Sequence, residues 1–195
     1  SYKLPPAWIP TQFRTENYSA VFKSSVPFWA IGFNTLKITL AVTIGQLVLC
    51  SMAGFAFARL RFPGRNIFFV ILLASLMVPQ QVTVIPIFLL MRNLGLMNNP
   101  LAVILPGLVS AFGVFLMRQF FLSLPQELFD AAKIDGAGPW SSFWRIALPL
   151  STPAMAALGI ITFNSTWTAY FYPLIFFNTW EQMTLPQGIA LLQTY

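Results

Sequence analysis

Few side chains in this sequence could carry chemistry, and most of the acidic ones lie in one segment. Glu127, Asp130 and Asp135 are three of the five acidic residues, and they belong to LPQELFDAAKIDGAGPWSSFWRIALPL, which runs from Leu124 to Leu150. Histidine is absent and cysteine occurs once, so His-based catalysis and metal sites built from His and Cys clusters are excluded. A GxxxxGK[ST] phosphate-binding loop is absent as well. Chemistry on a substrate is therefore not predicted.

The composition around this segment predicts a membrane protein. Hydrophobic residues make up 57% of the 195 residues and charged residues 8%, whereas soluble domains carry about 25% charged residues. The net charge of +6 comes from scattered Lys and Arg residues, with no run that could follow a phosphate backbone. Nucleic acid is therefore not an expected partner, and the expected solvent is the lipid bilayer.

Uncharged stretches long enough to cross a bilayer, which takes about 20 helical residues, recur along the chain. Four stretches contain no charged residue: Ile38–Ala58, Asn66–Met91, Asn93–Met117 and Ile146–Trp180. They predict an all-α bundle of membrane helices near 30–58, 66–91, 100–122 and 152–176. Residues 1–195 are expected to form one transmembrane domain, with an outer arm (1–27), three membrane helices (28–122), an inner segment (123–150), a fourth membrane helix (151–176) and an outer loop (177–195).

The positions of Lys and Arg near the helix ends predict the orientation, because these residues accumulate in short cytoplasmic loops. One basic group crowds the turn after the first predicted helix and consists of Arg59, Arg61 and Arg65. The second group accompanies the acidic segment and consists of Arg118, Lys133 and Arg145. Two predicted membrane helices separate the groups, so both are expected on the same face, the inner one.

The acidic segment has the turn and cap signals of two short helices. Ser123 and Gln126 match a capping box. Gly136 suits a left-handed helix stop, and Pro139 can start a second helix that Pro149 ends or kinks. The expected helix–turn–helix projects from the inner face of the bundle. It could dock into a groove of a partner and transmit that partner's movement, or it could only cap the bundle.

A longer pattern lies over the same segment. Asp130-Ala131-Ala132, three residues, Gly136, nine residues and Ile146-Ala147-Leu148-Pro149 resembles the EAA signature of ABC importer permeases, with Asp130 in place of the usual Glu. MVPQQVTVIPIFLLMRNLGLMNNPLAVILP is similar to the carbohydrate-uptake branch, in particular to permeases like the smaller membrane subunit of the maltose transporter. In that family the segment is a cytoplasmic coupling helix seated in a cleft of the ATP-binding subunit. The resemblance assigns coupling to Glu127, Asp130, Ala131, Ala132, Asp135, Gly136, Ile146, Leu148 and Pro149.

The resemblance implies a multi-pass permease subunit of a binding-protein-dependent importer in the bacterial plasma (inner) membrane. Its expected partners are ATP-binding subunits that hold ATP and Mg²⁺, a second permease chain, an extracytoplasmic solute-binding protein, membrane lipid and a sugar or oligosaccharide. No cofactor is expected on this chain. Permeases of this branch usually have six spans, so the sequence is expected to be a fragment of one. A permease for a polyamine, amino acid or osmolyte is the nearest alternative, and a scaffold or passive channel is a more distant one.

Polar residues within the predicted helices are candidates for the translocation path. Gln80 and Gln81 follow a proline, where a broken helix and amide side chains can line a pathway, although helix packing around a kink would explain them equally well. Asn164, Trp167 and Thr168 share one side of the predicted fourth helix by their spacing. A sugar needs hydrogen-bonding groups for its hydroxyls and an aromatic face for its C–H surfaces. The predicted helices lack Asp, Glu and His, which argues against proton coupling.

Overall fold

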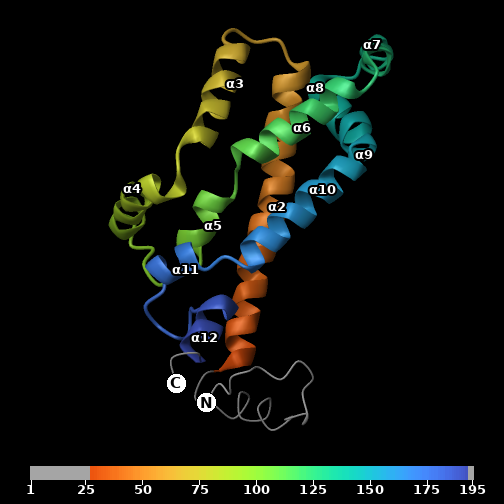
Figure 1. Ribbon diagram of the computed structural model, residues 1–195. Helices are drawn as coiled ribbons and strands as arrows, with labels where there is room; N and C mark the ends of the chain where they lie inside the picture. Colours follow the sequence, from red (N-terminus) through yellow and green to blue (C-terminus); the bar gives the residue numbers. More distant parts are fainter. Residues whose placement is uncertain (1–26, 193–195) are drawn as a thin grey trace, which may run out of the picture.

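A computed structural model describes residues 27–192, and this range contains helices but no β-strand (Figure 1). The longer helices are α2 (Phe28–Arg59), α4 (Gln80–Asn93), α6 (Ala111–Ser123) and α10 (Thr152–Trp167). The shorter ones are α3 (Arg65–Ala74), α5 (Leu101–Gly107), α7 (Gln126–Ile134), α8 (Pro139–Ser142), α9 (Leu148–Leu150), α11 (Phe171–Phe176) and α12 (Leu185–Leu192), with a 3₁₀ turn η1 (Ser75–Met77) and a π-helical turn η2 (Phe143–Ala147). Except for Pro27, the predicted outer arm lies outside the described residues.

Helix α2 forms the axis of the molecule and confirms that the stretch predicted at 30–58 is one helix, which is long and apolar enough to cross a membrane. Its 32 residues correspond to about 48 Å at 1.5 Å per residue, which exceeds the hydrocarbon thickness of about 30 Å in a typical bilayer. Helices α6 and α10 pack against it (Figure 1). The three helices enclose an apolar core whose buried members include Cys50, Val114, Met117 and Leu158.

The close contact between α2 and α6 depends on a glycine. A Cβ atom at Gly54 would lie 2.7 Å from Met117 Cβ and 2.9 Å from the backbone nitrogen of Arg118, well inside the optimal separation of non-bonded atoms. Arg118 reinforces the contact, because its Nε donates to the Phe57 carbonyl oxygen at 3.3 Å and its guanidinium lies 4.0 Å from the centroid of the Phe69 ring. The missing side chain at position 54 therefore sets the spacing of α2 and α6.

The single helix predicted at 66–91 is wrong, because the structure breaks it in the middle. Helix α3 with η1 ends at Met77, α4 begins at Gln80, and the two parts are bent by 103°. Proline lacks an N–H and disfavours helical conformation in the residue before it. Pro79 has this effect on Val78, which is extended at φ −84° and ψ 116°.

The single helix predicted at 152–176 is also wrong. Helix α10 ends at Trp167 and α11 begins only at Phe171. A proline at position 173 cannot donate to the carbonyl of residue 169, and its ring collides with that carbonyl in a regular helix. The helix therefore breaks about one turn before Pro173. The helix predicted at 100–122 is present as α5 and α6, with a non-helical break at Leu108–Ser110.

The apolar helices are compatible with a membrane protein, as predicted. By length and composition, Phe28–Arg59 and Leu101–Ser123 can each cross a bilayer. Two further pairs of helices are long and apolar enough to cross a bilayer only when both helices of a pair are counted together, and each pair is sharply bent. These pairs are Arg65–Met77 with Gln80–Asn93, and Pro139–Leu150 with Thr152–Trp167. The described part of the chain thus has two candidate spans, or up to four if each bent pair is one span.

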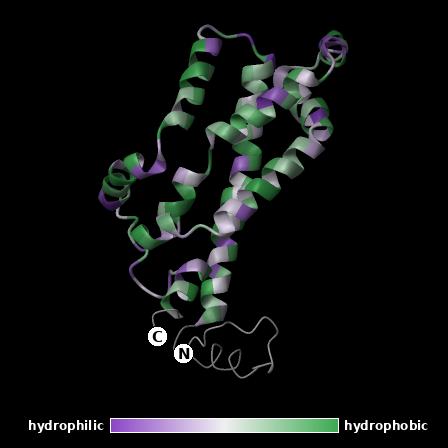
Figure 2. Cartoon of the chain, in the orientation of Figure 1, coloured by the Kyte–Doolittle hydropathy of each residue, from purple (hydrophilic) through white to green (hydrophobic). Residues whose placement is uncertain are grey.

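Polar residues gather at the end of the bundle where α7 and the turn between α2 and α3 lie (Figure 2). Contacts join the two basic groups at this end, since Arg59 donates to Gln126 at the start of α7 and Arg118 donates to the carbonyl of Phe57, two residues before Arg59. At the opposite end, the turn after α4 meets the end of α11, where Asn98 N–H donates to Phe176 O at 3.0 Å. The predicted outer loop contains helix α12, whose Leu185 N–H donates to Thr35 Oγ1 of α2 at 2.8 Å.

Candidate functional site

Helix α7, the first helix of the 123–150 segment, ends in the predicted glycine turn. Gly136 has φ +80°, a left-handed conformation. Its N–H donates to Lys133 O at 3.1 Å, and the N–H of Ala137 donates to Ala132 O at 2.8 Å, which is the pair of bonds of a Schellman motif. A Cβ atom at Gly136 would meet no atom within 4 Å. Glycine is therefore favoured here by the backbone conformation and not by packing.

The start of α7 corrects the predicted capping box. Pro125 is the N-cap residue, without a side-chain cap, and Ser123 Oγ donates to Phe120 O at 2.7 Å. Gln126 Nε2 donates to Asp130 Oδ1 at 3.0 Å and not to the backbone. The reason is that Ser123 still belongs to α6, where a serine hydroxyl binds a carbonyl of its own preceding turn.

An arginine from another helix ties the two helix ends together. Arg59, the last residue of α2, donates from Nη2 to Phe121 O at 2.5 Å and to Leu124 O at 2.6 Å. Its Nη1 donates to Gln126 Oε1 at 2.5 Å, and its guanidinium lies 4.2 Å from the centroid of the Phe129 ring. Carbonyls at a helix C-terminus lack intrahelical partners and carry the negative end of the helix dipole. One cation therefore fixes α2, the end of α6 and the start of α7.

An aromatic cluster holds the base of the segment. Phe143 of η2 is 3% exposed and lies 5.3 Å, centroid to centroid, from Phe55 of α2. Phe55 also contacts Phe121 of α6 edge-on at 5.8 Å and Phe129 of α7 at 6.2 Å. Rings from four elements meet at one place, so a displacement of α7 or η2 is opposed by contacts with α2 and α6.

The second half of the segment starts and ends near the predicted prolines. Pro139 opens α8, which continues through η2 into α9, and Pro149 lies within α9. A π-helical turn next to a proline is one way in which a helix adjusts to the missing N–H. Helix α9 ends at Leu150, and the chain bends there by 76° between the helical segment Pro139–Leu150 and α10. The predicted kink is therefore present.

The residues that the resemblance assigns to coupling divide into two sets. The exposed ones are Glu127, Asp130, Ala131, Asp135, Gly136 and Pro149. Ala132 is buried, and Ile146 and Leu148 are half-buried. Two large apolar side chains join the exposed set, Ile134 at 87% and Trp140 at 61% exposure. The segment therefore presents acidic and apolar side chains on a base that is fixed to the bundle.

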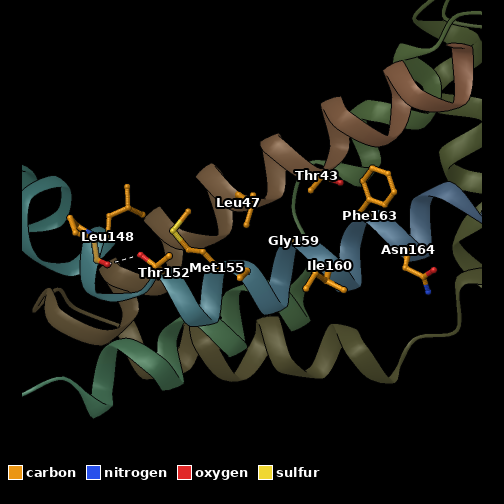
Figure 3. A pocket seen from close by; sticks show the side chains of 11 residues that line it. Thr43, Leu47, Leu148, Thr152, Met155, Gly159, Ile160, Phe163 and Asn164 are labelled. Atoms are coloured by element: carbon orange, nitrogen blue, oxygen red, sulfur yellow. Dashed lines mark hydrogen bonds between the residues drawn. The ribbon is translucent and has the colours of Figure 1, made fainter.

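One predicted path residue, Asn164, lines an open groove of about 980 Å³. The groove lies between α2 and α10, and its mostly apolar lining includes Leu47, Met155 and Ile160 (Figure 3). Thr168 Oγ1 donates to Asn164 O at 2.8 Å, so these two residues share a side of the helix end. The Trp167 ring stacks on Phe163 with centroids 5.6 Å apart. The stacking partner of Trp167 is therefore a residue of its own helix.

A second cavity, of about 620 Å³, lies where three helix breaks meet. The breaks between α3 and α4, α5 and α6, and α10 and α11 contribute Ser75, Val78, Gln80, Gly107, Val109, Ser110, Ala169, Tyr170 and Phe171. Further polar or aromatic lining comes from Gln46, Ser165, Thr166 and Tyr172. None of the lining residues found within 27–192 is charged. Broken helices in membrane proteins are typical of places where the backbone lines a cavity or a binding site.

The structure distributes the predicted path residues over different places. Gln80 lines the cavity and Asn164 lines the groove, whereas Gln81, Trp167 and Thr168 line neither. The side of α10 toward the cavity carries Ser165 and Thr166 instead. The role of the predicted residues in a translocation path stays a prediction. Gln80 is the one among them that lines the cavity.

Sequence reasoning missed two residues of the site, Gln46 and Arg59. Gln46 is an amide in the middle of the uncharged stretch Ile38–Ala58. An isolated amide in an apolar helix needs a polar partner, and this was the available signal. Arg59 was interpreted only as an orientation marker, because its partners Phe121 and Leu124 are backbone carbonyls more than 60 positions away, which leave no trace in the sequence.

A helical membrane bundle with a projecting helix–turn–helix and an uncharged polar cavity among broken helices has the features of a membrane permease. The pattern of the family described as binding-protein-dependent transport system inner membrane component matches residues 46–193. The chain belongs to this family. It is therefore a membrane component of a transport system.

Individual relatives and a solved structure agree with this assignment. The chain is 37% identical, over 185 residues, to the arabinooligosaccharides transport system permease protein AraQ of Halalkalibacterium halodurans, covering 95% of this chain and 66% of the relative. It is 35% identical, over 193 residues, to the sn-glycerol-3-phosphate transport system permease protein UgpE of Yersinia enterocolitica, covering 96% and 69%. A crystal structure of a bacterial ABC transporter involved in the import of the acidic polysaccharide alginate superimposes with a TM-score of 0.84 at 27% identity, covering 95% of this chain and 65% of that one. The chain thus spans about two thirds of the length of these proteins.

Proposed function

We propose that this chain is a permease subunit of a binding-protein-dependent ABC importer that moves a sugar or oligosaccharide across the bacterial inner membrane. ATP-binding subunits, which hold ATP and Mg²⁺, bind the 123–150 segment on the cytoplasmic side. A second permease chain completes the path, and an extracytoplasmic solute-binding protein delivers the solute at the opposite end. Hydrolysis of ATP on the partner moves the segment and, through it, the helices around the cavity.

The construction of the 123–150 segment carries this proposal. Helix α7 projects from the polar end of the bundle (Figure 1), and Ile134 and Trp140 are 87% and 61% exposed. A segment that only capped the bundle would bury these large apolar side chains against it, because their exposure to water is unfavourable. The base, by contrast, is held by Arg59 and by Phe143. An exposed tip on a fixed base can transmit the displacement of a bound partner to α2 and α6.

The cavity supports a carbohydrate as the solute. Its polar groups are amides and hydroxyls, and Tyr170, Phe171 and Tyr172 add aromatic rings. Small-molecule sites combine such apolar surfaces with a few polar groups that fix orientation. Carboxylates are the usual charge partners of a polyamine, and the cavity lining that the structure describes contains none. The names of the relatives refer to arabinooligosaccharides and to sn-glycerol-3-phosphate, which also supports the carbohydrate-uptake branch over amino-acid or osmolyte uptake.

Substitution of Gly136 by valine tests the coupling role. A β-branched residue is strained at φ +80°, so Gly136→Val should distort the turn without a packing clash. We expect ATP hydrolysis to continue in the reconstituted importer while uptake of the solute falls at least about tenfold. The reason is that the substitution adds about 1–2 kcal/mol of backbone strain to the turn that positions α7 for coupling. Gly136→Asn should be milder, since asparagine tolerates the left-handed conformation.

Gly138 in the same turn provides the matched control. It has an ordinary φ of −73°, and a Cβ atom there would also meet nothing within 4 Å. Gly138→Val should therefore leave uptake close to wild type. A passive channel makes a different prediction, namely that Gly136→Val conducts solute as well as the wild type and without ATP. That result would reject coupling through this segment.

A further inference from the structure

Gln46 is an amide in the middle of α2 that lines the cavity where the three helix breaks meet. An amide in a membrane-spanning helix is costly unless its N–H and C=O groups find partners. Gln46 meets this requirement with three long-range hydrogen bonds. Its position and its bonds together distinguish it from the other polar residues of α2.

The three bonds connect α2 to the end of α5, the start of α6 and the middle of α10. Gln46 Nε2 donates to Gly107 O at 2.8 Å. Gln46 Oε1 accepts from Ser110 Oγ at 3.1 Å and from Thr162 Oγ1 at 3.0 Å. We refer to these four residues, Gln46, Gly107, Ser110 and Thr162, as the Gln46 node.

The node compensates for the break between α5 and α6. Gly107 ends α5, and the last carbonyls of a helix have no intrahelical partner, so the Gln46 amide supplies one. Ser110 Oγ accepts from Gly113 N–H at 2.9 Å while its own proton goes to Gln46. A Cβ atom at Gly107 would lie 3.2 Å from both methyl carbons of Val42. The shape of the break is therefore determined by its contact with α2.

The node leaves one donor of Gln46 unused. A glutamine amide has two N–H donors and an oxygen with two acceptor sites. Ser110 and Thr162 occupy both acceptor sites, and Gly107 O takes one N–H, so the other N–H has no protein partner among the described residues. Because the oxygen is occupied, the amide cannot flip to present an acceptor without losing all three bonds. The cavity wall therefore offers an uncharged donor in a fixed orientation.

We propose that Gln46 is a specificity-determining residue of the transport path: the node fixes its amide, and the remaining N–H donates a hydrogen bond to an oxygen of an uncharged, hydroxyl-rich solute. This inference rests on the proposed function, since it takes the cavity as part of the path. The uncharged lining of the cavity supports the same class of solute, because an anion would need a cationic partner in a medium of low dielectric constant.

Replacement of Gln46 by glutamate separates this role from a purely structural one. Burial favours the neutral form of the acid, which can donate to Gly107 O and accept from Ser110 and Thr162 but lacks the second N–H. The full-length permease, assembled with its partner subunits in liposomes, is assayed with arabinotriose at mildly acidic pH. We expect Gln46→Glu to raise KM about fivefold to tenfold, as for one lost hydrogen bond, with an unchanged thermal midpoint of the complex. Gln46→Met, which also loses the node, should raise KM at least as much and lower the midpoint.

Thr39→Val is the matched control on the same helix. Thr39 is fully buried, and its hydroxyl oxygen has no hydrogen-bond partner in the described part of the chain, so KM should not change.

A wild-type KM for Gln46→Glu, with only a lower midpoint for Gln46→Met, would overturn the inference, because it identifies the amide as structural alone. Import of sn-glycerol 3-phosphate but not arabinotriose by the wild type would overturn the uncharged class and leave the importer function standing. Import of neither probe nor any other carbohydrate would refute the proposed function itself.

Discussion

Replacing Arg59 with methionine should release the junction of α6 and α7 from α2, and the start of α7 with it, because one guanidinium makes three hydrogen bonds at this junction and also contacts the Phe129 ring of α7. Hydrogen bonds to a charged group contribute about 1.5–3 kcal/mol each, so the three bonds to Phe121 O, Leu124 O and Gln126 Oε1 set an upper bound of roughly 9 kcal/mol. Water can replace part of this hydrogen-bond stabilisation, since Leu124 is half-buried and Gln126 is exposed. We therefore expect a loss of about 3 kcal/mol, which is roughly a hundredfold shift in the equilibrium between docked and undocked α7.

Amide hydrogen exchange measures this shift directly. In the purified permease, the backbone amides of Gln126–Ile134 should exchange roughly a hundredfold faster in Arg59→Met than in the wild type, because exchange of a locally unfolding element follows its opening free energy. Arg59→Lys should be intermediate, since a single ammonium keeps the charge but not the planar fork that reaches several acceptors. In the assembled importer, the same variants should hydrolyse ATP with a reduced yield of transported solute.

Arg61 is the control for charge alone. It is exposed in the same turn, and no hydrogen bond or ion pair is found for it within the described residues. Arg61→Met should therefore leave the exchange of α7 unchanged. If Arg59→Met also exchanged at the wild-type rate, the guanidinium would not be the anchor, and the aromatic cluster around Phe55 would have to hold α7 by itself.

Two further substitutions test the packing that supports the segment. Gly54→Ala should lower the stability of the α2–α6 contact by about 1–3 kcal/mol, since the new Cβ would lie 2.7 Å from Met117 Cβ; a thermal midpoint in detergent equal to that of Gly159→Ala, where the nearest atom is 3.7 Å away, would contradict this. Phe143→Ala should destabilise the protein by about 3 kcal/mol, because the ring is buried in the aromatic cluster, whereas Trp144→Ala, at 44% exposure, should have a smaller effect on the same midpoint.

The local features of the 123–150 segment could be predicted because they depend on neighbouring residues. The glycine turn at Gly136 and the helix start at Pro139 follow from backbone preferences that each residue carries with it. The prediction of a capping box was wrong because Ser123 lies between two helices and α6 extends far enough to include it. A cap motif predicts a boundary only if the preceding helix has already ended.

The membrane helices were predicted by hydrophobicity, which measures length but not continuity. The breaks near Pro79 and Pro173 were signalled by the prolines themselves, yet a proline in a membrane helix can produce a kink or a break. The outcome depends on whether neighbouring helices satisfy the freed backbone groups. At Gly107 the neighbour is Gln46, and no local pattern could have shown that the two residues meet.

The sequence by itself determined that the chain is an all-α membrane protein, where its apolar stretches lie, and that a helix–turn–helix joins two of them. These properties depend on apolar runs and on turn residues, which act over a few positions. The tertiary structure alone decided which polar groups meet: Arg59 with the end of α6, and Gln46 with Gly107 and Thr162, which are 61 and 116 positions away. In an apolar environment a polar side chain must find a partner, but the packing of distant helices determines which partner is within reach.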